Sequence, residues 1–318
     1  MKLFSIALAF IALLVFSCEE LDESASFGED GYFSDVELGD QYSDYGENPF
    51  VKTVEQSVST FSIDADGASY ANVRRFITQD QQLPPLGAVR TEELINYFDL
   101  GYSHKESEHP ISLNNEISEC PWNTEHRLLR IGIQGESIDL SSTRSNYVFL
   151  IDVSGSMAAE DKLDLLKAGF TRLVDELHPE DRIAIVTYAG AAEILLRSTP
   201  VSEKNTIVSA ISKLGAGGGT AGAEGIVTAY EIATDHFIEG GNNRIVLGSD
   251  GDFNIGISDQ EELVQLLEEK RESGIFITIL GVGRGNLNDS VMEQMANHGN
   301  GTYEYIDNIE QLKKVFML

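Results

Sequence analysis

The strongest constraint on the fold is a regular alternation of apolar and helical segments that begins at Tyr147. Tyr147 to Asp152 (YVFLID) and Arg182 to Tyr188 (RIAIVTY) are nearly continuous apolar runs, as expected of parallel strands buried on both faces. Further strands are predicted at 192–196, 244–247, 275–282 and 302–306, and helices at 163–177, 203–214, 221–237, 260–273, 288–297 and 308–316. This order predicts an α/β domain over residues 141–318: a doubly wound, mostly parallel sheet with helices on both faces.

A smaller module is predicted to precede this domain, at residues 49–140. The pattern SVSTFSI favours a strand at Ser57–Ile63, and two more strands are expected at Ile111–Glu119 and Arg127–Gln134. Helices are predicted at Ala68–Thr78 and Thr91–Phe98. The mixture is typical of a small α+β module, and it contains no set of residues that suggests catalysis.

The first residues have the features of an export signal. Lys2 is followed by an apolar run of 14 residues, Leu3 to Phe16, which is shorter than the roughly 20 residues of a membrane-spanning helix. The run ends in Val-Phe-Ser-Cys, which resembles the lipobox of bacterial lipoproteins, and we therefore predict a lipoprotein signal at 1–17 and a lipid anchor at Cys18. An ordinary signal peptide with a chance cysteine is the alternative. The anchor would place the protein in the bacterial cell envelope, on the periplasmic face or the cell surface.

Charge limits the partners that this chain can bind. Residues 19–47 hold eleven Asp or Glu residues and no Lys or Arg, which favours an acidic, disordered tether over residues 18–48. The whole chain of 318 residues has a net charge of -30, which disfavours binding to nucleic acid. Its two cysteines exclude a disulfide scaffold and a cysteine-based zinc site.

Oxygen-bearing side chains follow the predicted strands at positions where ligands bind in such sheets. The first strand leads into Asp152-Val-Ser154-Gly-Ser156, and the strand at 244–247 leads into Asp250. The glycine-rich loop GAGGGTAG between them contributes Thr220. Because the carboxyl ends of the strands share one edge, these loops should converge. Two carboxylates and three hydroxyls suit Mg²⁺, or Mn²⁺ or Ca²⁺ in its place, with a position left for one more anionic oxygen.

At these residues the sequence resembles the von Willebrand factor type A domain. The similarity runs from about 147 to 316 and includes DVSGSM, RIAIVTYAG, GGGTAG and SDGDFNIG. The resemblance implies a metal-ion-dependent adhesion site in which Ser154 and Ser156 bind the metal directly, Asp152 and Asp250 bind it directly or through water, and Thr220 joins when ligand is engaged. The segments STFSIDADGASYANVRRF, CPWN and LLRIGIQG resemble the N-terminal module of bacterial envelope proteins of this family. Such relatives usually continue into a further C-terminal domain.

Three hypotheses for function follow. The first is a binding module, not an enzyme, whose metal grips an acidic residue of a protein partner. The second is a metal-dependent hydrolase of phosphate esters, for which Arg284 is the nearest candidate to hold phosphate. The third is a structural protein with no working site. The glycines at Gly281, Gly283 and Gly285 do not have dinucleotide-binding spacing and predict a turn.

Overall fold

The computed structural model describes residues 39–44, 46, 48–61, 63, 66–102, 109–136, 143–219, 222–251 and 260–317, without the side chains of 260–262, 316 and 317. The predictions for Cys18, the signal at 1–17 and Thr220 lie outside these residues. In the described part of the chain, no helix is both long and apolar enough to cross a membrane.

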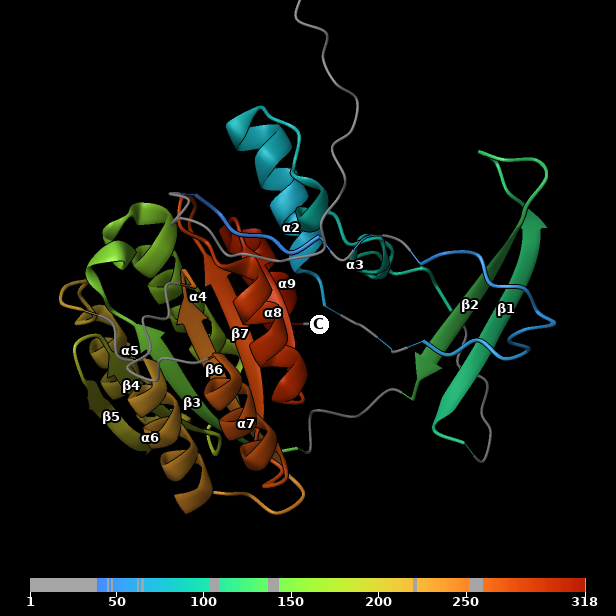
Figure 1. Ribbon diagram of the computed structural model, residues 1–318. Coiled ribbons are helices and arrows are strands. Elements are labelled where there is room, and N and C mark those ends of the chain that lie inside the picture. The colour runs from blue at the N-terminus through green and yellow to red at the C-terminus, as the bar shows by residue number, and fades with distance from the viewer. Residues whose placement is uncertain are drawn as a thin grey trace, which may run out of the picture. The chain divides into compact units, whose positions relative to one another are not determined.

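A six-stranded sheet forms the centre of the larger domain, in the order β5-β4-β3-β6-β7-β8 (Figure 1). Its strands are parallel except for β5, which pairs antiparallel with β4 at one edge. The strands are β3 Ser145–Asp152, β4 Arg182–Tyr188, β5 Ala192–Pro200, β6 Asn242–Ser249, β7 Phe276–Val282 and β8 Thr302–Ile306. The predicted doubly wound α/β fold is confirmed, and the edge strand is longer than predicted because it pairs along the whole of β4.

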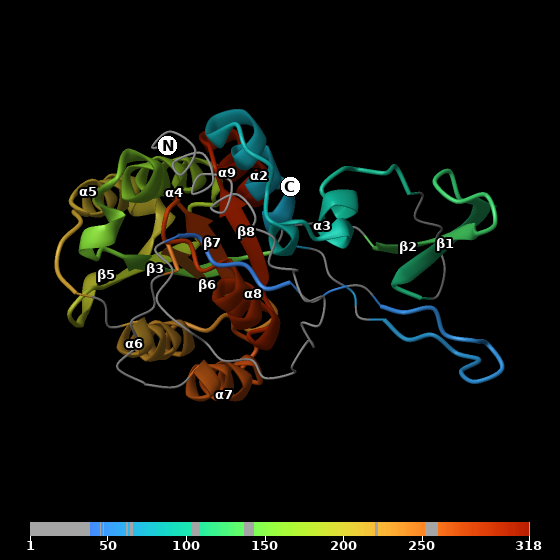
Figure 2. The ribbon, with the colours of Figure 1, turned by 45° about the horizontal axis from the view of Figure 1, so that its top comes forward.

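Helices cover both faces of the sheet, as Figure 2 shows. One layer contains α4 Leu165–Glu176, α5 Lys204–Ser212 and α9 Ile309–Met317. The other contains α6 Gly222–Asp235, α7 Gln260–Arg271 and α8 Asp289–His298. Side chains alternate along each strand, so Val148 and Leu150 of β3 belong to one core, and Phe149 and Ile151 belong to the other. The core of this domain therefore lies on both sides of one sheet.

Short helical turns join several of these elements. They are η1 Phe76–Asp80, η2 Leu86–Ala88, η3 Gly155–Ala158, η4 Glu160–Asp164 and η5 Val201–Glu203. The turns η3 and η4 connect β3 to α4, so the segment after Asp152 remains folded against the end of the sheet.

The smaller module contains a two-stranded antiparallel sheet and two short helices. Strands β1 Ile111–Glu119 and β2 Arg127–Gly135 form the sheet, and the helices are α2 Ala68–Arg75 and α3 Thr91–Asn96. These four elements agree with the sequence pattern. The strand expected at Ser57–Ile63 is wrong, because the described residues in that range are not paired with another strand and expose Val58 and Phe61.

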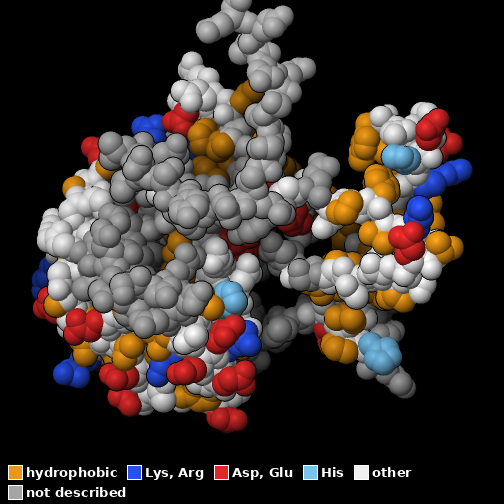
Figure 3. Space-filling view, in the orientation of Figure 1, with side chains coloured by type: hydrophobic (Ala, Val, Ile, Leu, Met, Phe, Trp, Pro, Cys, Tyr) orange, Lys and Arg blue, Asp and Glu red, His pale blue; other side chains and the backbone are white. Residues whose placement is uncertain are grey.

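Hydrophobic side chains gather on the β1–β2 sheet (Figure 3). Its register places Ile117 opposite Leu129 and Leu113 opposite Ile133. Ile117 and Leu129 are 69% and 56% exposed, respectively, so the apolar face of this ribbon has little cover. The alternation that predicted these strands therefore does not lead to a core in this part of the structure.

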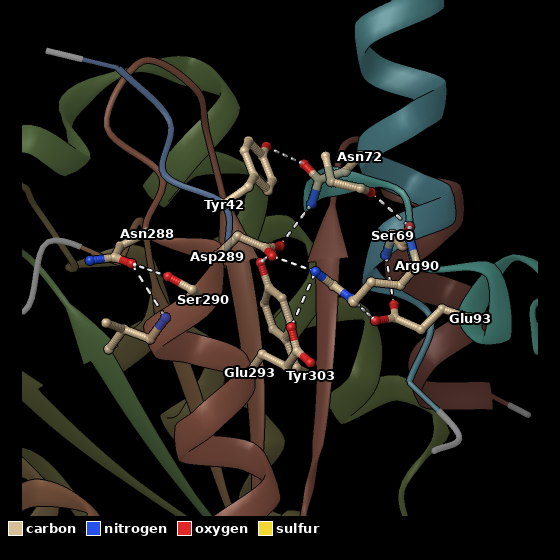
Figure 4. Close-up of polar contacts among 12 residues, drawn as sticks. Tyr42, Ser69, Asn72, Arg90, Glu93, Asn288, Asp289, Ser290, Glu293 and Tyr303 are labelled. Atoms are coloured by element: carbon tan, nitrogen blue, oxygen red, sulfur yellow. Dashed lines mark hydrogen bonds and ion pairs between the residues drawn. The ribbon is translucent and has the colours of Figure 1, made fainter. Parts of the chain in front are cut away.

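A buried polar network joins α2 and the residues before α3 to the larger domain (Figure 4). Arg90 forms ion pairs with Glu93 and, at 2.5 Å, with Asp289 at the start of α8. Asp289 also accepts hydrogen bonds from the Asn72 amide at 3.1 Å and the Tyr303 hydroxyl at 2.9 Å. Buried charges are costly unless they are paired, and here the pairing fixes α2 against α8 and β8.

Candidate metal site

The sheet places the predicted ligands at one edge. Strands β3 and β6 are adjacent and parallel, with Ile151 opposite Gly248. Asp152 is the last residue of β3, while Asp250 directly follows Ser249 at the end of β6. Both loops therefore leave the sheet side by side, as the order of strands requires.

Asp152 is fully buried and held in a fixed orientation. Its Oδ1 accepts a hydrogen bond from the backbone N–H of Ser154 at 2.8 Å. Its Oδ2 accepts from the Ser249 hydroxyl at 3.1 Å and the Tyr188 hydroxyl at 3.4 Å. Burial raises the pKa of Asp152, and the nearby charge of Asp250 raises it further. No Lys, Arg or His among the described residues forms an ion pair with Asp152, so this carboxylate would gain from a cation.

The two serines of the loop face each other. The Oγ atoms of Ser154 and Ser156 are 3.0 Å apart. The backbone of this loop is tied to the glycine-rich loop, because Gly155 N–H donates to Gly218 at 3.2 Å and Gly217 N–H donates to Val153 at 2.7 Å. The glycine-rich loop therefore lies beside the serines up to Gly219, the last described residue before Thr220.

Asp250 has a different environment from Asp152. One oxygen, Oδ2, accepts hydrogen bonds from Lys162 Nζ and from the Asn286 amide, each at 3.0 Å. Burial alone would raise the pKa of Asp250, but hydrogen bonds from Asn286, Lys162 and Ser156, together with the charge of Lys162, lower it. Asp250 is therefore held as a carboxylate although it is fully buried.

The structure brings together four of the five predicted ligands: Asp152, Ser154, Ser156 and Asp250. It joins the carboxylates to the two serines through hydrogen bonds. The described residues contain no group of three His, Cys, Asp or Glu suited to a metal, so a metal here would need oxygen donors besides the two carboxylates, such as the serine hydroxyls. Two buried carboxylates and two hydroxyls fit a small hard cation such as Mg²⁺. That these residues bind a metal stays a prediction.

Four further polar residues of the site were not singled out as ligands by the sequence. Ser249 and Tyr188 stand at the ends of β6 and β4, where topology could have indicated them. Asn286 lies in the loop after β7, which ends at the same edge. Lys162 gave no such signal, because a lysine in a helical turn is usually solvated.

The family model for the von Willebrand factor type A domain matches residues 146–317, and a second model, described as von Willebrand factor, matches residues 37–130. The chain is 42% identical over 285 residues to the uncharacterized protein YfbK of Escherichia coli (strain K12), covering 86% of this chain and 49% of that protein. The chain thus spans about half the length of the curated relatives that it matches first.

Two solved structures are also similar. A von Willebrand factor type A protein from Catenulispora acidiphila has a TM-score of 0.47 and 18% identity, covering 68% of this chain and 50% of that one. Proximal thread matrix protein 1 from the mussel byssus, described with a zinc-occupied MIDAS motif, has a TM-score of 0.42 and 25% identity, covering 55% of this chain and 44% of that one.

Proposed function

Because this chain belongs to the von Willebrand factor type A domain family, we propose that its site at the end of β3 and β6 binds a divalent cation and, through it, a protein partner. The proposed metal ligands are Asp152, Ser154, Ser156, Thr220 and Asp250, and the proposed ion is Mg²⁺. Domains of this family commonly take part in metal-dependent adhesion or protein interaction. A bound cation would supply an electrophilic centre for an acidic side chain of the partner.

The pair Asp152 and Asp250 carries this proposal. Both carboxylates are fully buried, and the charge of Asp250 raises the pKa of Asp152. A buried pair of like charges is unfavourable unless a cation lies near. The hydroxyls of Ser154 and Ser156 add neutral oxygen donors, so a bound ion would keep affinity for one more carboxylate. This is the chemistry of a binding site that recognises an acidic group.

No observation favours the hydrolase alternative. Arg284, the residue considered for holding phosphate, forms ion pairs with Asp80 at 3.1 Å and Asp161 at 3.7 Å. These carboxylates already balance its charge, which makes it a poor phosphate ligand. We therefore propose a binding module without enzymatic activity.

Isothermal titration of the chain with MgCl₂ and MnCl₂ tests the metal site. We expect binding by the wild type and its loss in Asp152→Ala, because the substitution removes one of two anionic ligands. Asp164→Ala is the control, since the Asp164 side chain is 67% exposed and lies outside the site. Equal affinities in the wild type and Asp152→Ala would contradict the proposal.

For the partner and the anchor, we propose a lipidated Cys18 in the cell envelope and a protein ligand that presents a carboxylate. Labelling with a fatty-acid analogue should mark the wild type and not Cys18→Ser; equal labelling would contradict the anchor.

A pull-down from envelope extract should recover a protein partner in the presence of Mg²⁺ but not in the presence of a chelator. Equal recovery of the partner with and without chelator would contradict a metal-dependent contact.

A further inference from the structure

A lysine ammonium is buried beside the proposed metal ligands. Lys162 lies in η4, and its Nζ donates to Asp250 Oδ2 at 3.0 Å and to Asn286 Oδ1 at 2.7 Å. The Asn286 amide donates to the same Asp250 oxygen, so the three side chains form a closed triangle. The Lys162 side chain is only 7% exposed. A lysine is rarely buried to this extent unless its charge has a specific partner.

The backbone opposite Lys162 is shaped to admit its long side chain. Gly283 has a φ of +77°, in the left-handed region that favours glycine. A Cβ at Gly283 would overlap the methylene groups of Lys162. The loop after β7 therefore uses a glycine where any larger residue would displace the lysine. The same loop supplies Asn286, so two of its positions are adapted to Lys162.

Lys162 changes the charge of the site. Asp152 and Asp250 contribute two negative charges, and the Lys162 ammonium reduces the net charge of the three groups to −1. A divalent cation would then leave the site with a net charge of +1, where the carboxylates alone would make it neutral. Arg284, in the loop after β7, and Asp161, in η4, pair with each other and are about half exposed, so solvent screens their charges more strongly than that of Lys162.

We propose that Lys162 is an internal cation of the metal site, which occupies Asp250 when no metal is bound, weakens metal binding, and leaves the loaded site positive toward an acidic partner. This inference rests on the proposed function. It assigns to Lys162 a positioning and charge-setting role, which is separate from metal ligation. The charge of Lys162 lowers the affinity of the site for the ion. The same charge stabilises the metal-free site and strengthens the attraction of the loaded site for the partner's carboxylate.

The test compares Lys162→Met with the wild type by titration with MgCl₂ and MnCl₂. Methionine retains an unbranched apolar side chain and removes the charge. We expect the variant to bind Mn²⁺ more tightly, on the order of tenfold, because a positive charge beside Asp250 no longer opposes the ion. Lys167→Met is the matched control: this lysine lies in α4, is 25% exposed, and contacts Asp164 and Leu214 outside the site. Its affinity should equal that of the wild type.

Thermal unfolding provides a second readout. In chelator, Lys162→Met should melt below the wild type, because Asp250 remains buried without its ammonium. Saturating Mg²⁺ should raise its midpoint by more than that of the wild type. A variant that folds only when Mg²⁺ or Mn²⁺ is present also supports the proposal, since the ion then replaces the ammonium.

Three results would overturn the inference. They are unchanged or weaker metal binding by a folded Lys162→Met, equal stabilisation of wild type and variant by Mg²⁺, and a variant that does not fold even with metal. A wild type that binds neither Mg²⁺ nor Mn²⁺ would instead refute the proposed function itself. The two failures are therefore distinguishable in one set of titrations.

Discussion

At the scale of single residues, chemically identical side chains acquire different properties from their surroundings. Asp152 and Asp250 are both fully buried, yet the pKa of the first is raised and that of the second is lowered. Asp152 receives hydrogen bonds from neutral donors, while Asp250 receives them from Lys162 as well as Asn286. A charged donor stabilises a carboxylate more than a neutral one does. The sequence predicted both aspartates as ligands but could not show this difference, because Lys162 and Asn286 lie far from Asp250 along the chain.

Glu304 of β8 allows a prediction about pH. Burial, with the charge of Glu93, raises the pKa of Glu304 to about 7, while Lys314 and the hydrogen bond from Gln311 oppose the increase. A carboxyl group with a raised pKa contributes stability at pH below its unfolded value of 4.5, and that contribution is lost as pH rises through about 7.

We therefore expect Glu304→Gln to remove this loss. At pH 8 the variant should unfold with a free energy higher by roughly 1–3 kcal/mol, and at pH 4.5 the two proteins should be similar. Urea denaturation at both values measures this, and Glu310→Gln, whose side chain is 72% exposed in α9, is the control. If Glu304→Gln were no more stable than the wild type at pH 8, the ionised carboxylate of Glu304 would not destabilise the fold, and the prediction would be wrong.

At the scale of elements, strand ends decide which loops meet. The sequence predicted strands and helices from apolar spacing, and most lie close to their expected ranges because periodic burial determines them. The strand expected at Ser57–Ile63 did not form, since a strand needs a neighbour to pair with and the described part of that range has none. Alternation of Val58 and Phe61 with polar residues indicates only that a segment could pair.

The loop between β7 and α8 provides a prediction at this scale. Gly283 and Gly285 both have positive φ, at +77° and +88°. A Cβ added at Gly283 would overlap the Lys162 side chain, whereas a Cβ added at Gly285 would meet no other atom of the described residues within 4 Å. Gly285→Ala should cost about 1 kcal/mol of unfolding free energy from backbone strain alone. Gly283→Ala should cost more, about 2–4 kcal/mol, because it also displaces a buried ion pair. Chemical denaturation of both variants measures the difference, and equal losses would contradict the packing of Lys162 on Gly283.

At the scale of the whole molecule, residues near the start of the described chain hold the loop that carries Asn286. Asp40 Oδ1 accepts hydrogen bonds from the backbone of Gly285 at 2.6 Å and Leu287 at 3.1 Å. Asp40 Oδ2 pairs with the buried Arg75 of α2 at 2.7 Å. Asp40 lies within the range predicted as a tether, and the structure places it in contact with the loop beside the metal site. The N-terminal residues are therefore part of the support of that site.

We expect Asp40→Ala to loosen this loop. The backbone N–H groups of Gly285 and Leu287 would lose their acceptor, and among the described residues Arg75 would keep only Asp80, at 3.8 Å, as a charged partner. Hydrogen exchange at the amides of Gly285 and Leu287 should become faster, and unfolding should require about 2–4 kcal/mol less free energy. Asp44→Ala is the control, because Asp44 is exposed and its side chain accepts a hydrogen bond from the nearby backbone N–H of Gly46. Unchanged exchange at both amides would contradict the support role of Asp40.

The sequence by itself determined the α/β architecture and the convergence of Asp152, Ser154, Ser156 and Asp250, because apolar periodicity specifies the strands and parallel strands end at one edge. Only the tertiary structure decided what surrounds those residues. Lys162, Asn286 and Asp40 come from segments far apart in the chain, and the hydrogen bond from Leu287 to Asp40 alone spans 247 positions. No local pattern relates these segments. Their contacts depend on how η4, the β7–α8 loop and the N-terminal residues pack on the sheet. The spacing of apolar residues predicts which elements form, but it does not predict which side chains of different elements come into contact.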